Sequence, residues 1–365
     1  MSKPMRLTNF ELLRIVAMLM VVTMHYLWYG GSLPSLTDSV NSIGYFALAV
    51  ESLAIVAVNL FVIVSGYFLV NIRFKLSRLL RLMAQVLFYS LLIPLLLFLI
   101  GIPILADSEG IYGVLAYVLP VSTQHYWFIT SYVLLILLSP LLNSAFLYYE
   151  KKELGVTIIL LIAVFSGIKS FVPVMLNFDN FGYDFGWFIC LYLCGAYIRT
   201  YDLPWLRKKN RAALLYLLCT ALIFGLKVGS HFIHSKTGQL KFFYDVPFHY
   251  NFILVFAAAV ALFYVFKEHD FKINISSAII NRVAPLCLGV YLIHMHYDIR
   301  DNWFSWSRIW PLSWRQGGVF GFALDMVLTV ILVFVICIAI DYIRLLLFTT
   351  VEKAWAKVRG KKEQR

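Results

Sequence analysis

Long apolar stretches separated by short polar ones run along almost the whole chain. Each apolar stretch holds about 20 residues, the length that a helix needs to cross about 30 Å of hydrocarbon. The strict alternation of apolar and polar residues that marks a membrane β-barrel is absent. The pattern therefore predicts about ten membrane-spanning helices, at residues 10–29, 47–70, 80–100, 127–147, 154–172, 185–201, 212–231, 248–267, 278–297 and 319–347.

The predicted fold is an all-α polytopic membrane protein with one membrane-embedded domain over residues 1–365. The longest stretches between spans lie around 101–124, 232–247 and 298–318, and they leave no room for a soluble domain. From about residue 349 the chain becomes a basic tail. No internal repeat or low-complexity linker divides it, so a single unit is expected.

The composition agrees with a membrane protein. Of the 365 residues, 61% are hydrophobic and only 14% are charged, and the mean hydropathy is +0.82. A soluble domain of this size carries far more charge. The cysteines all fall inside predicted spans, so no disulfide framework is expected; they are Cys190, Cys194, Cys219, Cys287 and Cys337.

The formal net charge of +12 follows the predicted topology. Most of the 31 lysines and arginines lie in alternate segments, which places those segments and both termini in the cytoplasm by the positive-inside rule. These segments are 3–6, 73–81, 151–152, 199–211, 267–282 and 344–365. We expect the charge to face anionic membrane lipid, and we expect no nucleic-acid partner.

Two ionisable residues interrupt the first span, Arg14 near its inner end and His25 near its outer end. Eleven residues at 100° each come within about 20° of three full turns, so both side chains point the same way, about 16 Å apart along the axis. Ionisable groups inside a span are costly unless they face the protein interior. Arg14, Met18, Val21 and His25 are therefore predicted to form one stripe that faces a cavity.

Further polar and aromatic side chains are predicted at the depth of His25. For most of them an interfacial aromatic belt is an equally good explanation. His25 and Glu51 are stronger functional candidates, because both adjoin long apolar runs and neither is a usual belt residue. The set comprises Glu51, His125, Tyr126, Trp127, Asp184, Trp187, His249, Tyr250, Asn251, Tyr291, His294 and Asp325.

A basic cluster follows the second span in "NIRFKLSRLLRL", residues 71–82, and contains Arg73, Lys75, Arg78 and Arg81. Such a cluster often only sets the topology or contacts anionic lipid. It can also bind phosphate, because guanidinium groups pair with phosphate oxygens in bidentate fashion. A phosphate-bearing ligand here, with a tail that reaches past Arg14 to His25, would link both ends of the stripe.

These residues resemble the acyltransferase-3 family of integral membrane acyltransferases, which modify surface polysaccharides and related glycans. The likeness rests on Arg, ten residues, then His in "ELLRIVAMLMVVTMH", and on "NLFVIVSGYFLV" at 59–70. The segments "HYWFITSYVLLILLSPLL" at 125–142 and "LGVYLIHMHY" at 288–297 follow in the expected order. The family commonly has Ile-x-Pro where "LMAQ" follows Arg81 here. The chain resembles the stand-alone members, which have no esterase-like domain.

The resemblance implies an O-acyltransferase in the cell membrane. Its donor would be acyl-CoA, usually acetyl-CoA, presented from the cytoplasm as a co-substrate. Its acceptor would be a hydroxyl of a surface polysaccharide or lipid-linked glycan. Neither a tightly bound cofactor nor a metal is expected.

Such a transfer needs a base for a hydroxyl whose pKa is far above 7, and histidine suits this role. We predict His25 as the general base, or as a transient acyl carrier, and Glu51 as the carboxylate that orients its ring. Arg14 would line the donor path. Arg73, Lys75, Arg78 and Arg81 would hold the nucleotide phosphates.

The remaining candidates have plainer alternatives. Ser65 is expected to allow, with Gly66, close helix packing or a bend rather than to act as a nucleophile, because no histidine lies near it. Trp127, Tyr291 and His294 are possible acceptor contacts or ordinary core residues. The competing function is a transporter or flippase of a glycan intermediate, which internal repeats and matched broken helices would favour. The sequence shows neither.

Overall fold

The computed structural model describes residues 8–173, 180–268, 277–303 and 317–362. Within these residues the protein is helical and has no strand, which confirms the predicted all-α class. Nine helical stretches of this described part are long and apolar enough to span a membrane. They are Thr8–Tyr29, Ser42–Leu69, Leu76–Leu99, Trp127–Tyr148, Lys151–Phe171, Asn210–Thr237, Lys241–Lys267, Ser277–His294 and Gly318–Ala354.

The chain folds into seventeen described helices, several of them short. They are α1 (Thr8–Tyr29), α2 (Ser42–Ala54), α3 (Ala57–Leu69), α4 (Leu76–Leu99), α5 (Leu105–Glu109), α6 (Ile111–Val118), α7 (Trp127–Tyr148), α8 (Lys151–Ile162), α9 (Lys169–Phe171), α10 (Phe185–Tyr201), α11 (Lys209–Thr237), α12 (Lys241–Asp245), α13 (Ile253–Lys267), α14 (Ser277–Val283), α15 (Cys287–His294), α16 (Tyr297–Arg300) and α18 (Gly318–Lys362). Short 3₁₀ or π turns join some of them.

Two predicted spans differ from the observed helices, and a third matches its helix but is too short to be counted among the nine. The predicted span 185–201 is helix α10, whose 17 residues lie at the short limit for crossing a bilayer. The span predicted at 47–70 is two helices, α2 and α3, separated by a turn at Ile55 and Val56. The span predicted at 319–347 is part of α18, a single helix of 45 residues that includes the predicted basic tail.

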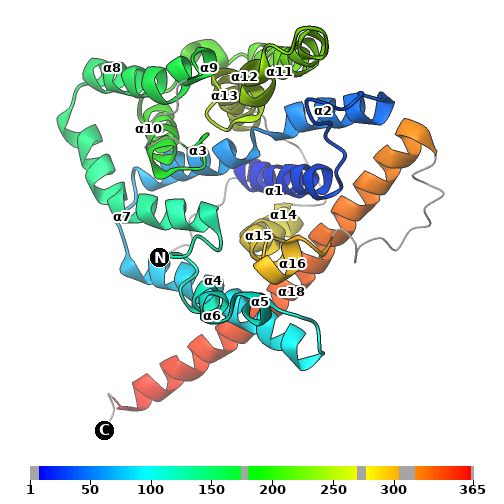
Figure 1. Cartoon of the computed structure of the whole chain (residues 1–365). Coiled ribbons are helices and arrows are strands. Elements are labelled where there is room, and N and C mark those ends of the chain that lie inside the picture. Colours follow the sequence, from blue (N-terminus) through cyan, green and yellow to red (C-terminus); the bar gives the residue numbers. More distant parts are fainter. Residues whose placement is uncertain (1–7, 174–179, 269–276, 304–316, 363–365) are drawn as a thin grey trace.

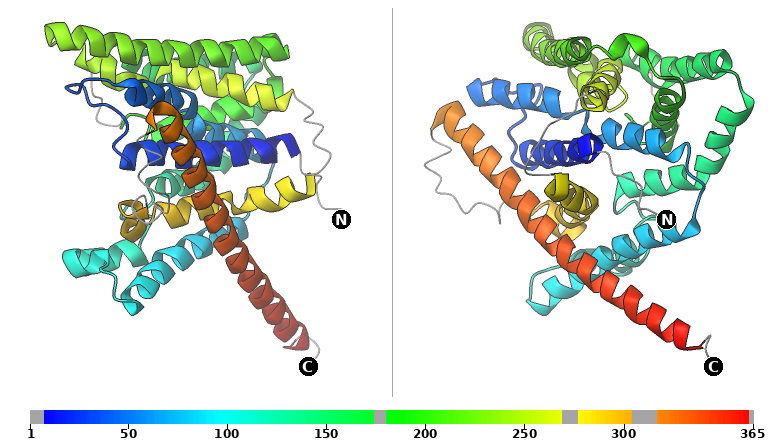
Figure 2. Two further views of the ribbon diagram at one scale, coloured as in Figure 1. Left: turned by 90° about the vertical axis from the view of Figure 1, so that its right-hand side faces the viewer. Right: turned by 180° about the vertical axis from the view of Figure 1, so that it is seen from behind.

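Helix α1 lies at the centre of the molecule (Figure 1). It contacts α2, α3, α13, α14, α15 and α18. Most of the long helices run roughly parallel to one another, whereas α18 crosses them obliquely and continues beyond the bundle (Figure 2). A helix of 45 residues is about 68 Å long, more than twice the hydrocarbon thickness, so its C-terminal part extends past the membrane.

The two ends of the bundle can be told apart by contacts between helix ends. At one end, Asn9 Nδ2 donates to the carbonyl of Phe266 at 2.9 Å, and Arg81 pairs with Glu352 at 3.4 Å. These contacts join the starts of α1 and α4 to the ends of α13 and α18. We call this the inner end, after the predicted cytoplasmic side. Of the basic residues behind that prediction, Lys3, Arg6, Lys272 and Arg365 lie outside the described residues.

Helices α3 and α10 cross at two glycines. A Cβ atom on Gly66 would lie 2.1 Å from the carbonyl oxygen of Tyr192, and one on Gly195 would lie 2.1 Å from that of Ile63. No side chain fits at such distances, so the backbones touch directly. Close packing of the kind expected for Gly66 is therefore present, and it brings the Ser65 face of α3 toward the centre of the molecule.

A buried polar network holds α18 against α4 and α15. The carboxylate of Asp341 accepts hydrogen bonds from Gln85 at 3.1 Å and from the Tyr89 hydroxyl at 2.8 Å. It also accepts from Arg344 at 3.0 and 2.7 Å. On α15, Gly289 lies so close that a Cβ atom would be 2.2 Å from the Asp341 carboxyl carbon. The buried charge thus has both an ionic partner and neutral donors.

Candidate functional site

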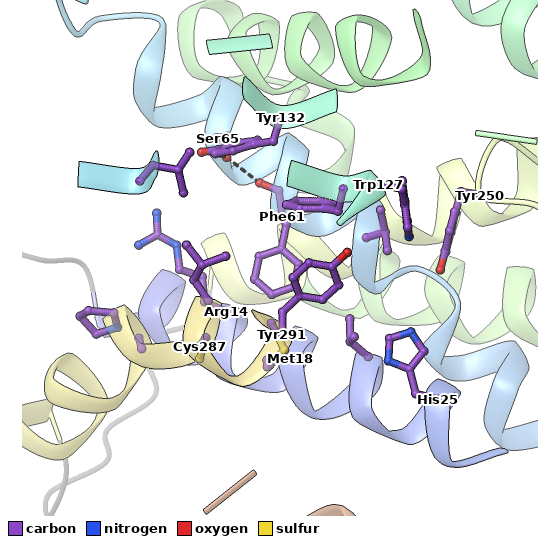
Figure 3. A pocket seen from close by; sticks show the side chains of 17 residues that line it. Arg14, Met18, His25, Phe61, Ser65, Trp127, Tyr132, Tyr250, Cys287 and Tyr291 are labelled. Atoms are coloured by element: carbon purple, nitrogen blue, oxygen red, sulfur yellow. Dashed lines mark hydrogen bonds between the residues drawn. The ribbon is translucent and has the colours of Figure 1, made fainter. Parts of the chain in front are cut away.

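A cavity of about 240 Å³ lies at the centre of the bundle, beside α1 (Figure 3). Arg14, Met18, Val21 and His25 all line it. The stripe deduced from helical spacing is therefore one wall of a cavity. The opposite walls come from α3, α4, α7, the 3₁₀ turn Ala284–Leu286 and α15, with Tyr250 before α13. They contribute Val58, Phe61, Ser65, Leu82, Trp127, Phe128, Tyr132, Tyr250, Ala284, Pro285, Cys287, Leu288 and Tyr291.

Arg14 occupies the inner part of this cavity (Figure 3). Its Nη1 donates to both carboxylate oxygens of Glu11, at 3.1 and 3.2 Å, one turn earlier on α1. The Arg14 side chain keeps 34% of its surface exposed, so a charged donor remains open to the cavity. Glu11 was not singled out from the sequence, although its i,i+3 spacing from Arg14 is the signal of such a pair.

Ser65 and Tyr132 also line the inner part of the cavity. The Ser65 hydroxyl contacts the Phe61 carbonyl at 2.8 Å and the Tyr132 hydroxyl at 3.1 Å. The hydrogen bond to Phe61 lies within its own helix, and neither contact supplies a general base. Ser65 has the surroundings of a packing residue.

His25 lies at the outer part of the cavity, where its Nδ1 is 2.9 Å from Nε2 of His294 on α15. The other ring nitrogen of His294, Nδ1, is 2.5 Å from the carbonyl oxygen of Val290. A carbonyl only accepts, so His294 Nδ1 carries a proton and its Nε2, in the neutral ring, accepts one. His25 therefore donates from Nδ1, which leaves the lone pair on its Nε2.

The predicted pairing of His25 with Glu51 is not found. Glu51 lies on α2, does not line the cavity, and its Oε2 has no hydrogen-bond partner among the described residues. His294 occupies the position that was assigned to Glu51. The sequence predicts Glu51 and His294 at the depth of His25, but it does not show which neighbouring helix faces the His25 ring. In the structure that helix is α15, which carries His294.

Of the three predicted acceptor contacts, two line the cavity. Trp127 and Tyr291 contribute aromatic rings to its walls, and the Trp127 ring stacks on Tyr250 with centroids 5.8 Å apart. His294 does not line the cavity, because it is buried behind His25 and holds that ring instead.

A second hollow of about 490 Å³ opens at the inner end. The predicted phosphate-binding residues Arg73, Lys75, Arg78 and Arg81 all line it. So does Arg344, for which the sequence indicates only a place in the basic C-terminal segment. Three residues, Leu82, Tyr132 and Leu288, line both this hollow and the central cavity, so the two spaces adjoin.

Residues 7–342 match the model of a protein family described as an acyltransferase domain. The match covers nearly the whole chain, including α1 with Arg14 and His25 and α15 with His294. Neither a curated protein nor a solved structure matches the chain. The basic hollow, the central cavity and the paired histidines thus belong to a membrane acyltransferase, and the chain is a member of the acyltransferase-3 family.

Proposed function

We propose that this protein transfers an acyl group, most simply acetyl, from cytoplasmic acyl-CoA to a hydroxyl of a cell-surface glycan or its lipid-linked precursor. The observation that carries this proposal is the continuity of three features. A hollow with five basic residues adjoins a narrow cavity, and that cavity leads to an imidazole with a free lone pair.

The donor would enter from the inner end. Arg73, Lys75, Arg78 and Arg81 would pair with the nucleotide phosphates, since guanidinium and ammonium groups form strong charge-assisted hydrogen bonds with phosphate. The adjoining cavity of about 240 Å³ would hold the pantetheine arm. Arg14 would then meet the polar groups of that arm or the thioester oxygen.

The reaction follows from the tautomer of His25. Its Nε2 would accept the proton of the acceptor hydroxyl while that oxygen attacks the thioester carbonyl. The new C–O bond forms, the C–S bond breaks, and the imidazolium returns the proton to the departing thiolate. His294 would keep the ring oriented and the Nδ1 proton in place, as the third member of a triad does for its base.

The test is acyl transfer by the purified full-length protein in nanodiscs, with acetyl-CoA and a glycan acceptor. We expect His25→Ala to lower the transfer rate by about 10²- to 10⁴-fold, the usual contribution of a general base. His234→Ala is the control, because His234 lies near the outer end of α11 and does not line the cavity. Transfer by His25→Ala at the rate of the unmodified protein would refute the proposal.

The donor site has its own test. Calorimetry with CoA should show about tenfold weaker binding for Arg78→Ala and for Arg81→Ala, and unchanged binding for His25→Ala. Lys208→Ala is the matched control, because Lys208 is an exposed basic residue of the inner end that does not line the hollow. Equal affinities across the series would place the phosphates elsewhere.

A further inference from the structure

The transfer proposed at His25 develops a negative charge on the oxygen of the thioester. When the hydroxyl oxygen attacks, the new C–O bond forms and one electron pair of the C=O bond moves onto that oxygen. The pair returns as the C–S bond breaks. Hydrogen-bond donors about 3 Å from such an oxyanion usually make the largest single contribution to catalysis. The cavity therefore needs a hydrogen-bond donor where the oxyanion forms.

The base determines where the oxyanion forms. A hydroxyl about 3 Å from His25 Nε2 that attacks a carbon about 3 Å further on places the carbonyl oxygen within about 7 Å of that nitrogen. The hydrogen-bond donor must therefore lie at nearly the depth of His25. Because acyl-CoA arrives from the basic hollow, the thioester lies on the inner side of the His25 ring.

Arg14 is too far from His25 to be this donor. The two residues are separated by eleven positions on α1, about 16 Å along the helix axis. Arg14 Nη1 donates to Glu11, one turn nearer the inner end, so the guanidinium is directed away from His25. Of the two roles open to Arg14, contact with the pantetheine arm is the one that its position allows.

Three side chains offer an O–H or N–H group to the part of the cavity near His25 (Figure 3), and all three line it: Trp127, Tyr250 and Tyr291. Ser65 and Tyr132 also offer hydroxyl groups to the cavity. These two hydroxyls lie at its inner part, 3.1 Å from each other. The depth of the base therefore leaves the first three as candidate donors to the oxyanion.

Helix α15 carries Tyr291 to the required depth. Leu288, one turn earlier on this helix, lines both the basic hollow and the central cavity. His294, one turn later, contacts His25 at 2.9 Å. Residues three apart share one face of a helix and lie about 4.5 Å apart along its axis. Tyr291 therefore lies between the entrance from the hollow and the base, one turn to the inner side of the contact with His25.

The Tyr291 hydroxyl lies against the N-terminus of α7. The main-chain N–H of Phe128, the second residue of α7, interacts with this hydroxyl as a hydrogen-bond donor. The helix has no side-chain cap, and its first backbone hydrogen bond runs from Thr130 to Tyr126, so the Phe128 N–H has no partner within α7. A hydroxyl oxygen that accepts from the positive end of a helix directs its own proton elsewhere and is a stronger donor.

Trp127 and Tyr250 belong to an aromatic cluster further toward the outer end. The Tyr250 hydroxyl interacts with that of Tyr183, which lines a hollow at the outer end. The Trp127 ring lies 5.8 Å from the Tyr250 ring and 4.5 Å from the Tyr183 ring, measured between centroids. These rings lie beyond the side from which acyl-CoA arrives. Their position favours contact with the acceptor, as predicted for Trp127, over contact with the thioester.

We propose that Tyr291 is a catalytic residue whose O–H group donates a hydrogen bond to the oxyanion of the thioester. The inference rests on the proposed function, which places the thioester beside His25. Tyr291 keeps its proton throughout, because the proton of the attacking hydroxyl passes to His25 and then to the departing thiolate. A phenylalanine ring would fill the same space and leave the oxyanion without this donor.

The first test is the release of CoA from acetyl-CoA by the full-length protein in nanodiscs, with water or maltotetraose as the acceptor. Tyr291→Phe should lower kcat by about 10²- to 10³-fold, the usual effect of removing one oxyanion donor. The KM for acetyl-CoA should stay within about twofold, because the lost hydrogen bond forms mainly in the transition state. An unchanged kcat would refute the proposal.

Two other tyrosines of the cavity supply matched controls. Tyr132→Phe removes a hydroxyl from the inner part of the cavity, where it contacts Ser65, and should leave kcat nearly unchanged. Tyr250→Phe removes a hydroxyl from the outer aromatic cluster and should lower kcat less than Tyr291→Phe does. A larger loss for Tyr250→Phe than for Tyr291→Phe would place the oxyanion against Tyr250 and contradict the assignment.

The second test observes the hydrogen bond without turnover. Infrared difference spectra of bound acetyl-CoA, with and without a heavy carbon isotope in the thioester carbonyl, isolate the stretching band of that carbonyl. A hydrogen bond to the oxygen weakens the C=O bond and lowers the frequency. In the His25→Ala protein, which should not transfer the acyl group, we expect a lower frequency than in the protein that also carries Tyr291→Phe. An identical band in the two proteins would overturn the inference.

The two tests separate this inference from the proposed function. If His25→Ala turns over at the unmodified rate while Tyr291→Phe lowers kcat and shifts the band, the base is wrong and the oxyanion donor stands. If His25→Ala abolishes turnover while Tyr291→Phe changes neither kcat nor the band, only the inference fails. The absence of a bound thioester band in the unmodified protein would reject the acyl-CoA donor and the inference together.

Discussion

At the scale of single residues, the function proposed for His25 depends on a hydrogen bond of its neighbour His294 to a main-chain carbonyl. The carbonyl of Val290 fixes the proton of His294 on Nδ1, and His294 then accepts from His25. The lone pair of His25 is thereby placed on Nε2, the nitrogen left to meet a substrate. A main-chain carbonyl on α15 thus sets the tautomer of a residue on α1.

This relay predicts that His294 is a positioning residue. His294→Ala should lower the kcat of acyl transfer by about 10²-fold or more, as loss of the orienting group does in comparable triads. The affinity for CoA should stay unchanged, because His294 lines neither the central cavity nor the basic hollow. Measured kcat and calorimetric Kd together separate this from a general loss of structure.

Glu51→Gln is the comparison variant. Glu51 was the partner predicted from the sequence, and it makes no hydrogen bond to His25 among the described residues. Its substitution should reduce kcat by less than tenfold. A larger loss for Glu51→Gln than for His294→Ala would restore Glu51 as the orienting group.

A second pair of buried histidines lies outside the membrane spans, near α16. His125 donates from Nδ1 to the Ala116 carbonyl at 3.1 Å and accepts from the Tyr297 amide at 3.2 Å. The ring of His296 lies 4.5 Å from that of His125. Burial lowers the pKa of His125 to about 4 and that of His296 well below its usual value. Both rings are therefore neutral in the folded protein at pH 7.

The pair predicts a loss of stability in mild acid. The unfolded chain protonates its histidines near pH 6.5, so between about pH 6.5 and 4 it binds more protons than the folded protein, and stability falls as the pH falls. Arg300 faces the pair, and its positive charge opposes protonation of the two rings. Burial raises the pKa of Asp298, so this carboxyl favours the folded state only when the pH is low enough to protonate it. The midpoint of thermal unfolding in detergent should drop between pH 7.5 and 5, and less for His125→Asn. An equal drop in that variant would contradict the assignment.

At the scale of helices, the hydropathy pattern predicts where spans lie because membrane insertion depends on local composition. The hydropathy pattern does not reveal turns and helix ends that depend on packing against neighbouring helices. Nothing in "ESLAIVAVNL" marks the turn at Ile55 and Val56 that divides α2 from α3, since the stretch holds neither glycine nor proline. The pattern also does not indicate the full length of α18, because its last residues are polar but still favour a helix.

The crossing of α3 and α10 gives a prediction at this scale. Gly66→Ala and Gly195→Ala each place a methyl group 2.1 Å from a carbonyl oxygen, so the helices must move apart. We expect a loss of about 1–3 kcal/mol or more in the free energy of unfolding, the usual cost of overpacking. The thermal midpoint of the purified protein measures it.

Gly225→Ala and Gly229→Ala are matched controls on α11. A Cβ atom at either position meets nothing within 4 Å, and alanine favours a helix over glycine by about 1 kcal/mol. These variants should be as stable as the unmodified protein or more stable. Similar losses in both pairs would mean that the crossing of α3 and α10 is not under steric constraint.

At the scale of the whole molecule, three spaces lie in sequence from one end of the bundle to the other. The basic hollow lies at the inner end, His25 lines the central cavity, and a third hollow of about 870 Å³ lies at the outer end. A donor and an acceptor that enter from opposite sides would meet at His25 without crossing the membrane. A single chain could in this way join cytoplasmic acyl-CoA to a glycan outside.

This arrangement requires that the two ends face opposite sides of the membrane, which cysteine labelling in cells can measure. The five native cysteines are buried, so the background should be low. A membrane-impermeant maleimide should label Ser35→Cys, an exposed position in the connection between α1 and α2 at the outer end, in intact cells. Lys208→Cys, an exposed residue of the inner end, should react only after the membrane is permeabilised.

The positive-inside distribution gives the reason for this expectation, because the basic segments gather at the end that holds the hollow. Labelling of Lys208→Cys in intact cells would place the basic hollow on the side without acyl-CoA. Labelling of both variants in intact cells would indicate leaky cells, which an unlabelled cytoplasmic marker protein excludes. Only the pattern with Ser35 outside and Lys208 inside would let a cytoplasmic donor and an outer acceptor reach His25 from opposite ends of the bundle.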